Sequence, residues 1–178
     1  MAEVAAAQES QQEEQKPRPK VAVIFDAFNS LVAVDKKGVV VAPYEALAAL
    51  QSLKRLGSVT LLAQEFSESR EAFKAVCPDS AEKSLYDLLG ELYGDLFGRD
   101  LFHWVGQKES VVDTHLNEEA IEPHNVYRVS NRLNFLLTRQ KSCQTVFFHH
   151  LQCSESQGSK NATARQTYHP DHTIIMLD

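Results

Sequence analysis

The sequence predicts a three-layer α/β domain, in which a Rossmann-like parallel sheet carries helices on both faces. Residues 21–25 form a continuous apolar run rich in β-branched side chains, which is typical of a strand buried on both faces. Further short apolar runs alternate with segments of helical periodicity, a pattern that indicates β-α-β units and therefore a parallel sheet. With 178 residues, the chain is long enough for one domain with a sizeable core. We expect that domain to span residues 21–178.

Residues 1–20 differ from the rest of the chain, because Ala, Gln and Glu dominate them and large apolar side chains are few. Such a segment buries too little apolar surface to offset the entropy of ordering. We therefore predict an acidic tail that is disordered or is ordered only by a partner. The tail contains no apolar signal core, and its glutamates disfavour an organelle presequence, so we expect no secretion signal or presequence.

Charge and cysteine content exclude several classes of protein. The chain carries 24 acidic against 18 basic residues, a formal net charge of -6, which disfavours a broad nucleic-acid-binding surface. No segment approaches the roughly 20 apolar residues of a membrane span. Cys77, Cys143 and Cys153 lie at unrelated spacings and predict reduced thiols rather than a disulfide framework. We expect the protein in the cytoplasm or another reducing intracellular compartment.

Turn residues and apolar spacing assign the first half of the domain. A turn and a short valine run over residues 35–41 predict a small hairpin or an extended arm. Pro43 suits the first turn of a helix, and Gly57 is expected to end that helix. A second buried strand is predicted over residues 59–62, and helical spacing returns over residues 67–97.

The second half is assigned by the same signals. Residues 102–105 predict a short strand. Pro123 is expected to open a helix that carries apolar residues at helical spacing, namely Val126, Val129, Leu133 and Leu136 or Leu137. A strand is predicted over residues 145–148, a weak helix over residues 159–167, and a last strand over residues 173–177.

The first predicted strand ends in a carboxylate that is followed, four residues later, by a hydroxyl side chain. Residues 24–31 are Ile-Phe-Asp-Ala-Phe-Asn-Ser-Leu. They resemble the first motif of the haloacid dehalogenase (HAD) superfamily, in which a strand ends in a nucleophilic Asp, with Thr or Ser four residues later. The resemblance implies a HAD-like fold, with Asp26 at the nucleophile position and Ser30 at the hydroxyl position. The short stretch between Asp26 and Ala63 leaves no room for a large cap domain.

The remaining motifs of the superfamily match this chain in order but without their reactive side chains. Phe28 stands where the phosphatases of the family have an acid/base Asp, and Ala63 where Ser or Thr holds the transferred group. Glu122 stands at the position of a charge-neutralising Lys. His149 and His150 follow the strand that we assign to the magnesium-binding motif. The chain therefore resembles a degenerate member that lacks most catalytic motifs.

These replacements predict a catalytically inactive domain without a cofactor. Attack by a carboxylate on a phosphoryl group requires positive charge nearby, because the nucleophile and the substrate are both anionic. We expect a structural or protein-interaction subunit of a larger assembly, whose partners are other protein subunits. In such a domain Asp26 is a residual strand-end acid that caps backbone N–H groups of the next turn.

Two other functions stay open at this point. One is a divergent Mg²⁺-dependent hydrolase of the phosphatase or dehalogenase type, in which Asp26 is both nucleophile and metal ligand. Ser30 would then orient the substrate, and Glu155 or Asp171 would complete the Mg²⁺ site. The other is a non-catalytic module that binds a small ligand in the same cleft.

A zinc site is a weaker hypothesis. Imidazole and thiolate groups suit zinc, and several cluster late in the sequence, namely His149, His150, Cys153, His169 and His172. Adjacent histidines on a strand point to opposite faces, however, so they cannot bind one ion together. We expect these histidines on the surface or in loops.

Overall fold

The computed structural model describes residues 19–106, 108–130, 132, 136, 143–150 and 172–176. Its main sheet is formed by the strands β1 (Val21–Asp26), β4 (Val59–Gln64), β5 (Trp104–Gly106), β6 (Val126–Ser130), β7 (Gln144–His150) and β8 (His172–Met176). They lie in the order β5-β4-β1-β6-β7-β8, and every neighbouring pair is parallel. A separate antiparallel hairpin consists of β2 (Ala33–Val34) and β3 (Val40–Val41).

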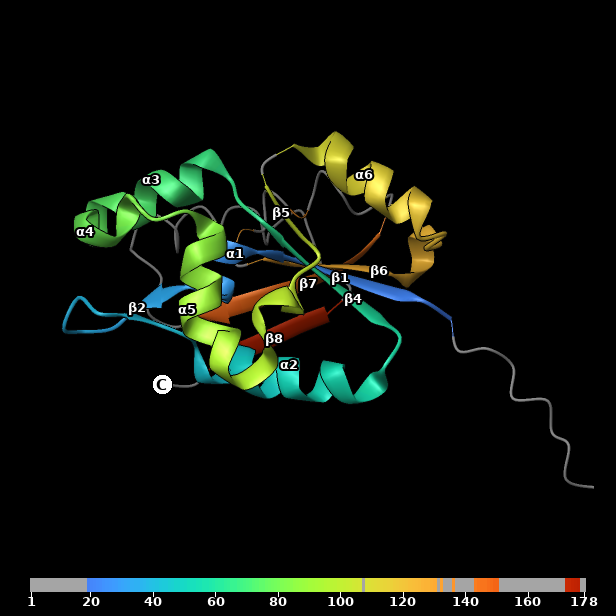
Figure 1. Ribbon diagram of the computed structural model, residues 1–178, viewed down its shortest axis with the longest axis horizontal. Coiled ribbons are helices and arrows are strands. Elements are labelled where there is room, and N and C mark those ends of the chain that lie inside the picture. The colour runs from blue at the N-terminus through green and yellow to red at the C-terminus, as the bar shows by residue number, and fades with distance from the viewer. Residues whose placement is uncertain are drawn as a thin grey trace, which may run out of the picture.

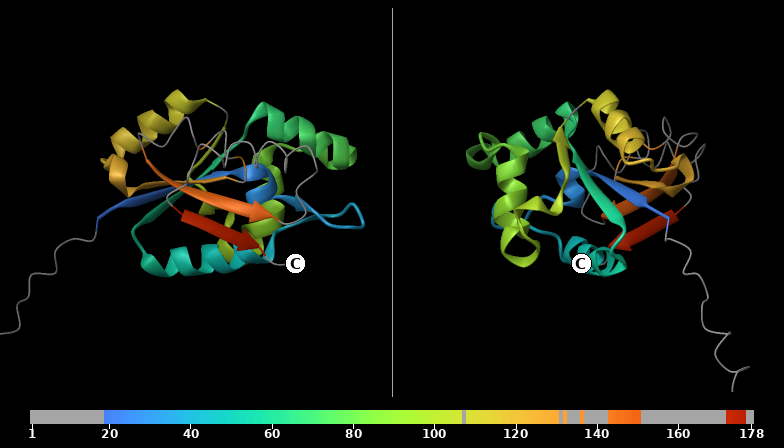
Figure 2. Two further views of the ribbon diagram at one scale, coloured as in Figure 1. Left: turned by 180° about the vertical axis from the view of Figure 1, so that it is seen from behind. Right: turned by 45° about the vertical axis from the view of Figure 1, so that its right-hand side comes forward.

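Helices cover both faces of this sheet (Figure 1). They are α1 (Ala27–Ser30), α2 (Tyr44–Leu56), α3 (Ser67–Val76), α4 (Pro78–Ala81), α5 (Leu85–Phe97) and α6 (Glu109–Glu118), with the 3-10 turns η1 (Arg99–Leu101) and η2 (Pro123–Asn125). Both views of Figure 2 place α2 and α6 on opposite sides of the sheet. The predicted three-layer α/β fold is confirmed. Within the described ranges, no helix is both long enough and apolar enough to cross a membrane.

Each face of the sheet has its own core. On one face, Val23 and Phe25 of β1 pack with buried residues of α2 and α5. On the other face, Ala22 and Ile24 pack with Val112 of α6. Successive residues of a strand point to opposite faces, so a strand in the middle of this sheet must be apolar at nearly every position. This requirement explains the uninterrupted run that precedes Asp26.

The predicted first-half elements are present. The hairpin forms between β1 and α2, where no larger insertion separates the two elements. Helix α2 follows Pro43 and ends at Gly57, whose φ of 77° is a left-handed conformation that glycine adopts without strain. The segment 67–97 is helical but is broken into α3, α4 and α5.

The breaks in that segment have local causes. Pro78 lacks a backbone N–H and cannot continue α3, so it begins α4 instead. Ser84 then caps α5, because its hydroxyl accepts a hydrogen bond from the Asp87 backbone amide at 3.1 Å.

The predicted helix after Pro123 is wrong. Pro123 begins only the single turn η2, and Val126 to Ser130 form strand β6, which pairs in parallel with β1. Helix α6 was not predicted, and it is the helix that connects the edge strand β5 to β6. The predicted strands near residues 102–105, 145–148 and 173–177 correspond to β5, β7 and β8. The tail and the predicted helix over residues 159–167 lie outside the described residues, apart from Pro19 and Lys20 of the tail.

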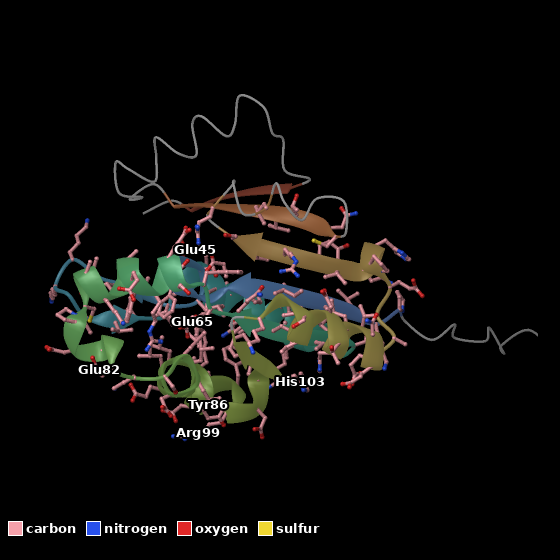
Figure 3. All side chains as sticks on the ribbon, turned by 90° about the horizontal axis from the view of Figure 1, so that it is seen from above. Glu45, Glu65, Glu82, Tyr86, Arg99 and His103 are labelled. Carbon is pink, nitrogen blue, oxygen red and sulfur yellow. The ribbon has the colours of Figure 1, made fainter. Side chains whose placement is uncertain are left out.

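Tyr93 offers a test of how α5 is fastened to the rest of the domain. Its side chain is 1% exposed, and its hydroxyl donates a hydrogen bond of 2.6 Å to the carbonyl oxygen of Leu31. Tyr93→Phe leaves that buried carbonyl without its donor, so we expect the free energy of unfolding to fall by about 1 to 3 kcal/mol. Urea unfolding measures the change. Tyr86→Phe is the matched control, because Tyr86 lies on the outer side of the same helix and is 49% exposed (Figure 3). Equal effects of the two substitutions would contradict the assignment.

Candidate functional site

Asp26 is the last residue of β1 and lies at the carboxyl end of the parallel sheet. Its residue surface is only 2% exposed. Strand β4 lies on one side of it and β6 on the other, so the ends of three adjacent strands meet here. Ligands of open α/β sheets bind at this edge of the sheet.

Two serine hydroxyls hold the Asp26 carboxylate. Ser130, at the end of β6, donates from Oγ to Oδ2 at 3.0 Å. Ser69 of α3 donates from Oγ to Oδ1 at 3.3 Å. The prediction that Asp26 caps the next turn is wrong, because its side chain makes no capping hydrogen bond to α1. Each carboxylate oxygen instead accepts from a side chain that is distant in sequence.

Arg132 contacts both of these serines. Its backbone N–H donates to Ser130 Oγ at 3.0 Å, and its guanidinium Nη1 donates to Ser69 Oγ at 3.3 Å. Its Nη2 forms an ion pair with Glu68, whose side chain is 79% exposed. Arg132 therefore contacts both hydroxyls that bind Asp26, Ser130 through its backbone N–H and Ser69 through its guanidinium.

The environment of Asp26 favours its protonated form more than water does. Burial raises the pKa of the carboxyl from 3.8 to about 6, because the charged form loses hydration. The hydrogen bond from Ser130, the positive charge of Arg132 and the hydrogen bond from Ser69 each oppose this rise in pKa. Desolvation is the larger effect.

Ser30 and Phe28 do not face the Asp26 carboxylate in the way a catalytic group would. The Ser30 hydroxyl donates to the backbone carbonyl oxygen of Asp26, one turn back in α1. Phe28 is 1% exposed and packs against the ring of Phe73, with 4.8 Å between the ring centroids. Both side chains therefore stabilise the turn after β1.

A second buried polar contact lies beside Asp26 on the same face of the sheet. Gln64 is the register partner of Asp26, and its Oε1 accepts a hydrogen bond of 3.1 Å from Nη1 of Arg128. Thr145 of β7 pairs with Arg128 and is also buried. Ala63 belongs to the opposite core, so Gln64 rather than Ala63 is the β4 residue aligned with Asp26. Our assignment of Ala63 to the site is therefore corrected.

Glu122 does not belong to this site. It precedes η2 and the first residue of β6, which pairs with Ala22 near the start of β1. It is therefore at the amino end of the sheet, opposite Asp26, and our assignment of a reversed charge beside Asp26 is wrong. The cation that acts on Asp26 is Arg132.

The magnesium-motif position was also placed on the wrong strand. His149 and His150 end β7, which is separated from β1 by β6. The strand ends adjacent to Asp26 are Gln64 of β4 and Ser130 of β6. The side chains of the two histidines and of His172, and the candidate ligands Cys153, Glu155, His169 and Asp171, lie outside the described part of the structure.

The described surroundings of Asp26 do not fit Mg²⁺. Magnesium prefers carboxylates and water in octahedral geometry. Among the residues that the structure describes, no group of three or more His, Cys, Asp or Glu side chains could hold a metal ion. The groups that contact the Asp26 carboxylate are hydroxyl donors, with a guanidinium behind them.

The sequence interpretation missed four residues of this region, namely Ser69, Arg128, Ser130 and Arg132. One signal could have found Arg128, because a charged residue inside the run Val-Tyr-Arg-Val-Ser is unusual for a buried strand. Ser69 carries no such signal, since it comes to Asp26 from a helix 43 residues further along the chain.

A groove of about 360 Å³ is separate from this site. It lies between α2, β4 and the end of α5, with Leu53, Val59 and Phe97 among its lining residues. Val59 begins β4, so the groove is at the amino ends of the strands, away from Asp26.

No family model matches this sequence, and no curated protein matches it. The structure is similar to that of a haloacid dehalogenase-like hydrolase from Streptococcus pneumoniae, with a TM-score of 0.54, 10% sequence identity, and coverage of 89% of this chain and 94% of that chain. A putative HAD family hydrolase from Streptomyces avermitilis aligns with a TM-score of 0.44 and 14% identity, over 87% of this chain and 80% of that chain. At 10% identity the first likeness shows the fold alone. The chain has the HAD-like fold, which is the fold predicted from the motif that contains Asp26 and Ser30.

Proposed function

We propose that this chain is a catalytically inactive domain with the HAD-like fold, and that it serves as a structural or protein-interaction subunit of a larger assembly. One observation supports this above the others. The Asp26 carboxylate is 2% exposed, and each of its oxygens already accepts a hydrogen bond from a serine.

Nucleophilic attack sets geometric requirements that this arrangement does not meet. The attacking oxygen must approach the reacting atom to about 3 to 3.5 Å along an open path. Here Asp26 is 2% exposed, and Ser69 of α3 and Ser130 of β6 each contact one of its oxygens. We infer that α3 has to move away from the end of the sheet before a substrate reaches Asp26.

The outer surface supports the interaction role. Tyr44 is 79% exposed at the start of α2, and tyrosine is enriched in protein interfaces. Val39 and Val76 are 54% and 63% exposed. The thiol of Cys77 lies 3.6 Å from the carbonyl oxygen of Gly38, so these two valines flank one contact between the hairpin and α3. We take these exposed side chains as the candidate partner surface.

A divergent hydrolase that uses Asp26 as its nucleophile is the second candidate. One observation favours it, because a buried acid with a raised pKa and a neighbouring arginine, at the carboxyl end of a parallel sheet, is typical of functional sites. This function requires an open state in which α3 has left Asp26.

A hydrolysis assay separates the two candidates. We expect the wild-type chain, incubated with small phosphate esters or haloacids and Mg²⁺, to release product no faster than Asp26→Asn. Tyr86→Phe serves as a control for preparation quality, since this exposed residue lies outside the site. Turnover that is present in the wild type and in Tyr86→Phe but lost in Asp26→Asn would establish the hydrolase and reject the inactive domain.

The subunit role predicts an assembly in native extracts. The chain alone has a mass of 20.0 kDa. We expect it to elute from a sizing column as a larger complex, and we expect Tyr44→Asp with Val76→Asp to release it. Glu45→Lys, which changes the charge on the same part of α2, is the matched control and should leave the complex intact. Elution of the wild-type chain as a monomer contradicts the subunit role.

The raised pKa of Asp26 predicts a pH-dependent gain in stability for Asp26→Asn. Because the folded-state pKa is above the unfolded-state value, the stability from the protonated carboxyl is fully present below pH 3.8 and is lost as pH rises through about 6. Asparagine stays neutral, so the stability of Asp26→Asn relative to the wild type should rise across this range by at most about 3 kcal/mol. Urea unfolding at a series of pH values measures it. A difference that stays constant with pH would show that folding does not raise the pKa of Asp26.

A further inference from the structure

We propose that Arg132 is the fixed internal cation of this site, which holds the buried Asp26 carboxylate through two serines and closes α3 over the end of the sheet. The inference deepens the proposed function and rests on it, since the residue held in this way is 2% exposed. Arg132 acts here as a positioning residue.

The hydrogen bonds form a closed ring. Ser130 and Ser69 each donate to one oxygen of Asp26, at 3.0 Å and 3.3 Å. Each hydroxyl accepts in turn from Arg132, Ser130 from the backbone N–H at 3.0 Å and Ser69 from Nη1 at 3.3 Å. The donor of each serine is thus directed at Asp26 because its acceptor is occupied by Arg132. The ring connects β1, β6 and α3.

The charges explain why the ring needs an arginine. An ionised carboxylate that is 2% exposed is costly unless a cation and hydrogen bonds compensate it. The Arg132 side chain is 21% exposed, so its charge is only partly screened by solvent. Its ion pair with Glu68 contributes little by comparison, because Glu68 is 79% exposed.

The other nearby cations serve different groups. Arg128 donates to Gln64 and lies two residues before Ser130 on β6. Arg70 pairs with Glu65 at 3.4 Å and donates to the Lys83 carbonyl oxygen at 2.6 Å. Within the part of the chain that the structure describes, Arg132 is the residue that contacts both serines of Asp26, and its guanidinium is bound to Ser69.

A double-mutant cycle between Arg132 and Asp26 tests the proposal. At about pH 8, where Asp26 is ionised, we expect Arg132→Gln to lower Tm by about 4 to 8 °C, the size of a lost charge-assisted contact in a domain of this length. In the Asp26→Asn background the same substitution should change Tm by less than about 2 °C, because the charge it compensates is gone. Arg132→Lys should lower Tm by an intermediate amount, since lysine keeps the positive charge but lacks the planar guanidinium that reaches Ser69.

Each outcome of the cycle decides the matter. Equal falls of Tm in both backgrounds would show that Arg132 only packs, and no fall in the wild-type background would show that it does not hold the site. If Arg132→Gln does not fold, Ser69→Ala replaces it in the same cycle, because it removes one arm of the ring. Ser52→Ala is the matched control, since Ser52 is an exposed α2 serine that bonds only its own helix.

The double-mutant cycle and the hydrolysis assay can reject their two proposals independently of each other. Asp26-dependent turnover would reject the inactive domain while the coupling between Arg132 and Asp26 could still be measured. A cycle without coupling would reject the role of Arg132. The proposal of an inactive domain would still stand, because it is tested by the absence of turnover.

Discussion

The pairing of β1 with a parallel strand on each side determines what surrounds Asp26. Because β4 and β6 run in the same direction as β1, all three carboxyl ends come to one edge of the sheet. The register then selects the neighbours, placing Gln64 beside Asp26 on β4 and Ser130 beside it on β6. Helix α3 completes the site by bringing Ser69 across this edge.

A buried carboxylate imposes a cost on the whole arrangement. Desolvation raises the Asp26 pKa to about 6, and two hydroxyls and the charge of Arg132 offset only part of that effect. A charge retained at such a cost needs either a function or a supporting network. Ser69, Ser130 and Arg132 supply this network. Each carboxylate oxygen accepts a hydrogen bond from one serine, and both serines accept from Arg132.

The sequence predicted correctly the strands whose residues are determined only by packing in the core. The strands β1 and β4 lie in the middle of the sheet, so the run before Asp26 is wholly apolar, and the run before Gln64 contains only Thr60 as a polar residue. Strand β6 is equally central, but Arg128 and Ser130 interrupt its apolar pattern because they face the buried polar groups of the site. The apolar residues that remain, Val126 and Val129, are three positions apart and imitate the period of a helix.

That local error propagated to the site. Assigning a helix after Pro123 left β6 unpredicted, so the magnesium-motif position was assigned to His149 and His150 of β7 instead of the end of β6, the strand that pairs with β1. It also placed Glu122 beside Asp26, which implied that the site had lost its positive charge. The site in fact contains Arg132, so loss of positive charge is not what argues against catalysis here. The argument instead depends on access, because Asp26 is 2% exposed and α3 brings Ser69 against its carboxylate.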